Sequence, residues 1–165
     1  MVEHFKGVNE MNEAITIKGR LKVDYYKDGV LVQEGKWRNN IVTTAGKNAL
    51  ASLLNSASAG TSLVSHMGFG TSTTAVAAGD VALGAELTIG SNGYNRQAVT
   101  RSNPSGNVIQ YVATLTGISA ATTIQEAGLL SAATGGTLVA HQLTGAQPMN
   151  TSADSLVVTW QLQFN

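Results

Sequence analysis

Leu156-Val157-Val158-Thr159-Trp160-Gln161-Leu162-Gln163-Phe164 is the stretch of the sequence that decides the fold. Apolar and polar residues alternate along most of it, which is the period of a β-strand with one buried face. Trp160 and Phe164 lie on the apolar face, and a frayed end would leave roughly 1.5–3 kcal/mol of burial free energy unrealised for each large side chain. The pattern therefore predicts a strand in the middle of a sheet.

The same alternation recurs near the start of the chain, from Ala14 to Tyr26. One face of this stretch is mostly apolar and the other is mostly charged, which predicts a second half-buried strand. Lys27-Asp28-Gly29 then forms a turn signal, because an Asp-Gly pair tolerates the positive φ of a tight hairpin. Residues 30–38 are expected to return antiparallel to this strand, with Trp37 as a core or interface aromatic residue.

The chain between these regions and its last strand contains further short apolar stretches separated by turn signals about ten residues apart. Many short strands with regular turns are typical of sandwiches and jelly rolls. We therefore expect an all-β fold, an antiparallel β-sandwich of jelly-roll type. The predicted strands are residues 63–69, 94–101, 108–115, 123–131 and 137–143.

One segment has a helical period instead. Apolar residues recur three or four apart from Ala45 to Ala57, and Thr43 or Thr44 can serve as the N-cap. One short α-helix is predicted at about residues 44–57. Its stripe of Leu50, Leu53 and Leu54 is expected to close an open edge or end of the sandwich.

The domain organisation follows from these patterns. Residues 14–165 are predicted to form a single β-sandwich domain, and residues 1–13 an N-terminal arm. The arm mixes charges with isolated apolar residues, so it is either a frayed tail or a segment that orders on a neighbouring subunit with Phe5 as its anchor.

Composition limits the classes of function. Charged residues make up 12% of the chain and aromatic residues 5%, and the formal net charge is zero. A charged fraction about half the usual share favours a protein packed against other subunits, although secreted β-proteins share this composition. No nucleic-acid-binding tract, membrane-spanning stretch or secretory leader is evident. The chain has no cysteine and hence no thiolate chemistry.

A basic row of Lys18, Arg20 and Lys22 projects from the polar face of the first strand. Such a row can be a solvated face that discourages edge pairing. Alternatively it can dock an acidic protein surface or a phosphate group. Nucleic acid is the weaker interpretation, since no exposed aromatic residues are interleaved with the charges.

Catalytic and metal-binding signals are weak. The three histidines, His4, His66 and His141, have no metal-ligand spacing, and no G-x-S-x-G elbow occurs. No cofactor or metal is expected, and the protein is not expected to be an enzyme. Folding can still bring distant groups together, so a hydrolase using His66 or His141 is kept as a hypothesis of another class. The residues of such a set are His66, His141, Asp80, Glu86 and Glu126.

Three segments resemble virion structural proteins of tailed bacteriophages. Residues 40–54 resemble the pattern N-x-V-T-x-x-G-x-x-x-L-x-x-L-L. Residues 67–84 are similar to G-x-G-x-x-x-T-x-A-x-x-x-D-x-x-L, and residues 123–130 to T-I-x-E-A-G-L-F, with Leu130 in place of the final Phe. Together the three segments span roughly residues 40–130.

The resemblance implies a capsid cement or decoration protein that binds and bridges major capsid protein subunits to stabilise the shell. It implies a homo-oligomer, a dimer or trimer, made in the host cytoplasm and located on the capsid surface of the virion. A tail-fibre or neck and collar module, joining virion parts or contacting a host receptor, is the alternative. The candidate capsid-interface residues are Phe5, Lys18, Arg20, Lys22 and Trp37.

Overall fold

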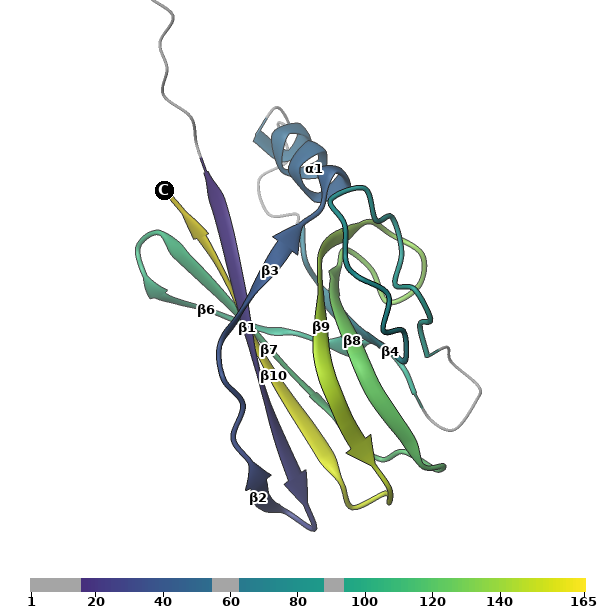
Figure 1. Cartoon of the computed structure of the whole chain (residues 1–165). Coiled ribbons are helices and arrows are strands. Elements are labelled where there is room, and N and C mark those ends of the chain that lie inside the picture. Colours follow the sequence, from purple (N-terminus) through teal and green to yellow (C-terminus); the bar gives the residue numbers. More distant parts are fainter. Residues whose placement is uncertain (1–15, 55–62, 88–93) are drawn as a thin grey trace, which may run out of the picture.

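The computed structural model describes residues 16–54, 63–87 and 94–165, which form strands and one helix (Figure 1). The elements before residue 63 are β1 (Ile17–Lys27), β2 (Val30–Gln33), β3 (Arg38–Val42) and α1 (Thr44–Leu54). The later strands are β4 (His66–Gly70), β5 (Gln97–Ala98), β6 (Thr100–Ser105), β7 (Val108–Leu115), β8 (Thr122–Leu130), β9 (Leu138–Met149) and β10 (Ser155–Phe164).

The strands form one continuous antiparallel sheet in the order β5-β4-β8-β9-β3-β1-β10-β7-β6, with β2 added beside β1. β3 turns one corner of this sheet, because residues 38–40 pair with β1 and residues 41–42 pair with β9. The consecutive strands β5 and β6 turn the other corner, pairing with β4 and β7 respectively. The sheet is therefore curled into a nearly closed, barrel-like body.

The prediction of a mostly antiparallel β-structure with one short helix is confirmed. The jelly-roll sandwich is a finer description that this topology does not establish. In this structure the two halves of the sheet are joined by β3 and by the consecutive strands β5 and β6, which pair with both halves. Alternation and turn spacing do not predict such connections.

The predicted central position of the last strand is also confirmed. β10 pairs with β1 on one side and with β7 on the other. Leu156, Val158 and Trp160 are fully buried. They pack in the main core with inward residues of the neighbouring strands, including Leu21, Val23, Tyr111 and Leu115.

The hairpin that follows β1 is shorter than the sequence predicts. Asp28 and Gly29 have φ values of 50° and 78°, so the predicted turn is present. β2 ends at Gln33, and residues 34–37 do not pair with β1 as a strand. The Gly35 N–H instead donates to the Asp24 carboxylate at 2.9 Å. The chain then rejoins the same edge of β1 as β3, so the expected single return strand is divided in two.

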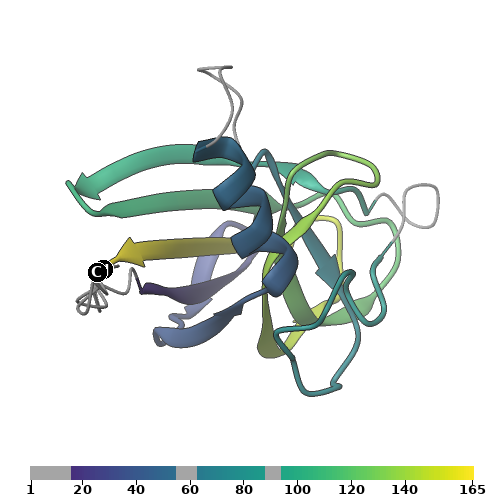
Figure 2. The same ribbon diagram turned by 90° about the horizontal axis from the view of Figure 1, so that it is seen from above.

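Helix α1 starts where the pattern predicts and lies across the strands at one end of the barrel (Figures 1 and 2). Thr43 is its N-cap, because its hydroxyl accepts the Gly46 N–H at 3.0 Å. A Cβ at Gly46 would lie 2.3 Å from the Val139 carbonyl oxygen, so glycine lets the helix approach β9 closely. The predicted end at residue 57 and the side chains of Leu53 and Leu54 lie outside the described residues. Within the described part of the chain, no helix has the length and apolar character needed to cross a membrane.

Candidate functional site

The outer face of β1, β10 and β7 carries the basic row that the sequence singles out. Leu21 and Val23 point into the core, so the intervening side chains of β1 point outward. The neighbouring strands add glutamines to this surface through the pairs Lys18–Gln163, Arg20–Gln161 and Gln161–Gln110. We call this surface the Arg20 face, and it consists of Lys18, Arg20, Lys22, Trp37, Gln110, Gln161 and Gln163.

Arg20 is held in place on this face by its neighbours. Its Nε and Nη2 atoms donate to the Gln161 side-chain oxygen at 2.9 and 2.8 Å. The Gln161 amide nitrogen donates in turn to the Gln110 side-chain oxygen at 2.8 Å. The guanidinium carbon also lies 4.4 Å from the centroid of the Trp37 ring, within the range of a cation–π interaction. The structure thus joins two predicted site residues, Arg20 and Trp37, into one preorganised group.

The positive charge is unevenly balanced across the face. The Lys22 ammonium lies 2.9 Å from Glu34 and 3.3 Å from Asp24, and the hydrogen bond with Glu34 is the main cause that raises the pKa of Lys22. Lys18 and Arg20 have no carboxylate within ion-pair distance among the residues that the structure describes. The uncompensated charge is therefore concentrated at Lys18 and Arg20.

Apolar side chains are exposed elsewhere on the β1–β2 hairpin, on β2, which pairs with the Tyr25–Lys27 end of β1. Val30, Leu31 and Val32 are 65%, 44% and 54% exposed, and Trp37 is 40% exposed. We call residues 30–32 the hairpin tip. The predicted return strand does not indicate this exposed surface, although three consecutive apolar residues in a strand cannot all face one side. Trp37 is not a core residue, and its predicted role at an interface remains a prediction, while Phe5 lies outside the described residues.

A buried group of acids and imidazole lies on the opposite outer face, over β8 and β9. His141 Nδ1 is 2.7 Å from the Asp80 carboxylate, and His141 Nε2 is 2.9 Å from the Glu126 carboxylate. His141 and Glu126 are buried, with 3% and 0% of their surface exposed. The pKa of Asp80 is lowered, mainly because its carboxylate accepts the Ala77 N–H and also because it contacts His141.

Glu126 also holds the loop at residues 71–87. One carboxylate oxygen accepts the Ala85 N–H at 2.7 Å and the Ser72 N–H at 3.3 Å, and the other accepts the Gly84 N–H at 2.9 Å. The second and third resembling segments, residues 67–84 and 123–130, therefore meet at this carboxylate. One ring nitrogen of His141 contacts Asp80 of this loop and the other contacts Glu126 of β8, so His141 also anchors the loop to the sheet.

The other members of the five-residue set lie in separate interactions. Glu86 forms a two-pronged ion pair with Arg96 at 2.5 and 2.9 Å. His66 Nδ1 lies 2.8 Å from the Ser65 hydroxyl, and that hydroxyl also lies 2.7 Å from the Ser131 carbonyl oxygen. Within residues 16–54, 63–87 and 94–165, no three histidine or acidic side chains are placed to hold a metal ion together. His4 lies outside the described residues.

Comparison of the chain with protein-family models, curated proteins and solved structures finds no significant match. The function proposed below therefore rests on the geometry of the Arg20 face and on the three resembling segments.

Proposed function

We propose that this protein is a non-enzymatic bacteriophage capsid cement or decoration protein that binds and bridges major capsid protein subunits. The observation that carries the proposal is the Arg20–Trp37 pair, which lies on an open sheet face, with the exposed hairpin tip at the Tyr25–Lys27 end of the same strand β1. Such a surface fits a protein partner better than a small substrate, because it is broad and combines an arginine, an aromatic ring and apolar side chains.

The physical state of Arg20 supports a docking role. A side chain that is already held by Gln161 and stacked on Trp37 loses less conformational freedom when a partner binds. The uncompensated charge at Lys18 and Arg20 favours an acidic partner surface. We assign the capsid contact to the Arg20 face and the hairpin tip, and we assign Phe5 of the N-terminal arm to a contact with a neighbouring subunit.

The phage assignment itself is supported by the three resembling segments. Two of them supply Asp80 and Glu126, which hold the loop at residues 71–87 onto the sheet. The first segment also contacts this loop, since the Thr44 N–H donates to the Ala78 carbonyl oxygen at 2.7 Å. The proposal includes a jelly-roll relationship, a dimeric or trimeric protein and a position on the capsid surface. Binding to the closed shell would stabilise the shell by mass action.

Copy number per particle tests the position in the virion. A cement protein is expected in hundreds of copies per particle, measured by quantitative gel densitometry of purified virions. A few tens of copies would instead support the tail-fibre or neck alternative. Particles that lack the protein and release DNA at an unchanged temperature and salt concentration would contradict the cement role.

Shell binding by surface variants tests the docking face. Arg20→Glu is expected to weaken binding to undecorated shells about 30-fold, the effect of losing roughly 2 kcal/mol at an interface hot spot. Trp37→Ala should weaken binding in the same direction. Lys47→Glu is the charge-matched control, because Lys47 is exposed on α1, away from the Arg20 face. Equal binding by Arg20→Glu and Lys47→Glu proteins would remove the Arg20 face from the proposal.

A further inference from the structure

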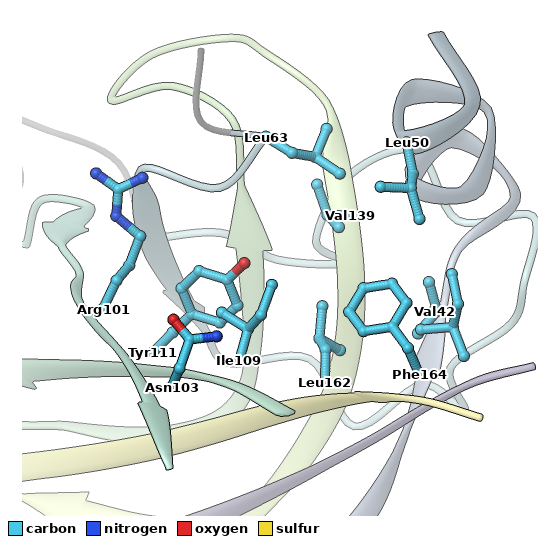
Figure 3. A pocket seen from close by; sticks show the side chains of 12 residues that line it. Val42, Leu50, Leu63, Arg101, Asn103, Ile109, Tyr111, Val139, Leu162 and Phe164 are labelled. Carbon is cyan, nitrogen blue, oxygen red and sulfur yellow. The ribbon is translucent and has the colours of Figure 1, made fainter. Parts of the chain in front are cut away.

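An apolar pocket of about 450 Å³ opens between α1 and the strands, at the end of the barrel where α1 lies (Figure 3). Leu50 of α1 and Val139 of β9 lie across from Leu162 and Phe164 of β10. The edge formed by β6 and β7 is more polar and carries Arg101. A pocket of this volume is within the range of roughly 300–1,000 Å³ that accommodates organic ligands or several apolar side chains.

The chain enters β1 beside this pocket. Thr16 and Asn165 exchange two backbone hydrogen bonds of 2.9 Å, and the next pair of the ladder, Ile17 and Phe164, lines the pocket. Fifteen residues precede Thr16, which is enough for an extended segment of roughly 50 Å. Residues 1–13 are therefore long enough to reach a neighbouring molecule that lies against this end of the barrel.

The composition of residues 1–13 complements the pocket. Val2, Phe5, Val8 and Met11 are apolar and recur every three residues. The segment also contains three glutamates and one lysine, so its side chains sum to 1 − 3 = −2 with histidine neutral. Arg101 has no ion-pair partner among the described residues, and it provides a positive charge at the edge of the pocket.

We infer that the pocket binds residues 1–13 of a second copy of this chain, with Phe5 inserted among Leu50, Leu162 and Phe164. The direction of the chain favours a second copy over the same chain. Thr16 is held at the end of the β1–β10 ladder by Asn165, so a segment that continues the direction of β1 leaves this end of the barrel, where a second copy in the proposed homo-oligomer would meet it. The exchange of arms gives the proposed homo-oligomer a specific contact.

Disulfide trapping in the full-length protein tests this inference, because the natural chain has no cysteine. Phe5→Cys protein mixed with Leu50→Cys protein should form a mixed disulfide at least ten times faster than Phe5→Cys mixed with Val81→Cys. Val81 is 76% exposed in the loop at residues 71–87 and does not line the pocket, so it measures random collision. Circular dichroism of each variant establishes that it is folded before mixing.

Three results would overturn the inference. Equal trapping rates at positions 50 and 81 would show that Phe5 does not select the pocket. A Phe5→Cys/Leu50→Cys double variant that closes only an internal disulfide would show that the chain fills its own pocket. Native mass spectrometry that finds a small apolar molecule in both the full-length protein and a protein lacking residues 1–13 would identify a different occupant.

A second measurement is independent of any cysteine variant. Deletion of residues 1–13 should leave a folded protein of lower oligomeric state in sedimentation analysis, and an unchanged oligomer would contradict the exchange of arms. The inference extends the oligomeric part of the proposed function, yet both tests use the isolated protein without shells. Successful trapping with failed shell binding would reject the cement role alone. Failed trapping with successful shell binding would reject the arm site alone.

Discussion

The two outer faces of the barrel are built in different ways. The face of β8 and β9 is covered by the loop at residues 71–87, which adds a small apolar cluster of Leu83, Leu130 and Leu138 over the sheet. No described segment covers the outer face of β1, β10 and β7 in Figures 1 and 2. The side chains of the Arg20 face lie on this uncovered surface. Charged groups lie on both faces, but Glu126 and His141 are buried on one, whereas Lys18 and Arg20 are exposed on the other.

This difference distinguishes two roles of charged residues in this protein, which are to stabilise the fold and to contact a partner. Glu126 is fully buried and accepts hydrogen bonds from three backbone N–H groups, so its charge serves the fold. Arg20 is exposed and is fixed by a neutral glutamine and an aromatic ring, so its charge remains available to a partner. Substitutions on the covered face are therefore expected to change the stability of the protein, and substitutions on the uncovered face are expected to change its binding to a partner.

Removal of the Glu126 carboxylate should have the largest effect on stability. Glu126→Ala leaves His141 and three backbone N–H groups without their buried acceptor, so we expect a loss of about 3–5 kcal/mol in the free energy of unfolding. Urea denaturation at pH 7 measures this loss. Glu34→Ala is the matched control on the uncovered face, where the exposed Glu34 pairs with the half-buried Lys22, and its urea midpoint should change little. Similar losses for both variants would abolish the distinction between the two faces.

The close packing beneath the covering loop gives the next largest effect. A Cβ at Gly70 would lie 2.2 Å from a Glu126 carboxylate oxygen and 2.6 Å from the Ala85 carbonyl oxygen. Gly70→Ala should therefore destabilise the protein by about 2–3 kcal/mol through overpacking. Gly79→Ala in the same loop is the control, because no atom lies within 4 Å of its added Cβ, and its melting temperature should remain near the wild-type value. Equal melting temperatures for the two variants would contradict this packing.

Acid should weaken the covered face through Asp80. The folded-state pKa of Asp80 is lowered by the Ala77 N–H and by His141, so the unfolded chain takes up the proton first as the pH falls. The resulting stability is present above the unfolded pKa of about 3.9 and is lost as the pH falls through the lower folded pKa. Asp80→Asn should cost about 1 kcal/mol at pH 7 and progressively less below about pH 4.

The pH dependence of urea midpoints for wild-type and Asp80→Asn proteins measures this contribution. Asp154 also has a lowered pKa, mainly through the Asn150 N–H, so both proteins retain its share of the acid sensitivity. The informative quantity is therefore the difference between the two proteins. A difference that stays constant from pH 7 to pH 3 would contradict the assigned role of Asp80.

The smallest effect is expected for the coupling of Arg20 and Trp37. A double-mutant cycle with Arg20→Ala and Trp37→Ala compares the free energies of unfolding measured by urea denaturation. The cycle should give a coupling free energy of about 0.5–1 kcal/mol, typical of an exposed cation–π pair. Arg20→Lys is a useful control, because lysine keeps the charge but cannot reproduce the two bonds to the Gln161 oxygen. A coupling indistinguishable from zero would mean that the two side chains are not held together in solution.

Local patterns predicted most strands and the helix start, but the predicted strand 94–101 is replaced by the short β5 and by β6 (Thr100–Ser105), and β9 continues to Met149 beyond the predicted end at residue 143. The alternation in β1 and β10 identified their buried faces, and the position before an apolar period limited the N-cap to Thr43 or Thr44, of which the structure uses Thr43. These features depend on residues close together in the chain. The division of the return strand into β2 and β3 was missed, because the bond between Gly35 and Asp24 depends on tertiary placement.

The candidate sites were predictable only in part. Lys18, Arg20 and Lys22 were placed on one face because a strand has a period of two, whereas the stacking of Trp37 on Arg20 requires the fold. Asp80, Glu126 and His141 belong to the set that the sequence offers for joining by the fold, and their meeting depends on a loop that no periodicity describes. The apolar pocket was missed, since its walls come from segments distant in the chain.

The two corner strands have a mechanical consequence. β3 and the β5–β6 pair are each hydrogen-bonded to both halves of the barrel, so the halves are joined by backbone as well as by packed side chains. A tensile load applied at the Arg20 face would pass through these backbone ladders into the strands beneath the loop at residues 71–87. Under a pulling force the two halves should therefore yield together as one unit and not slide apart as separate layers.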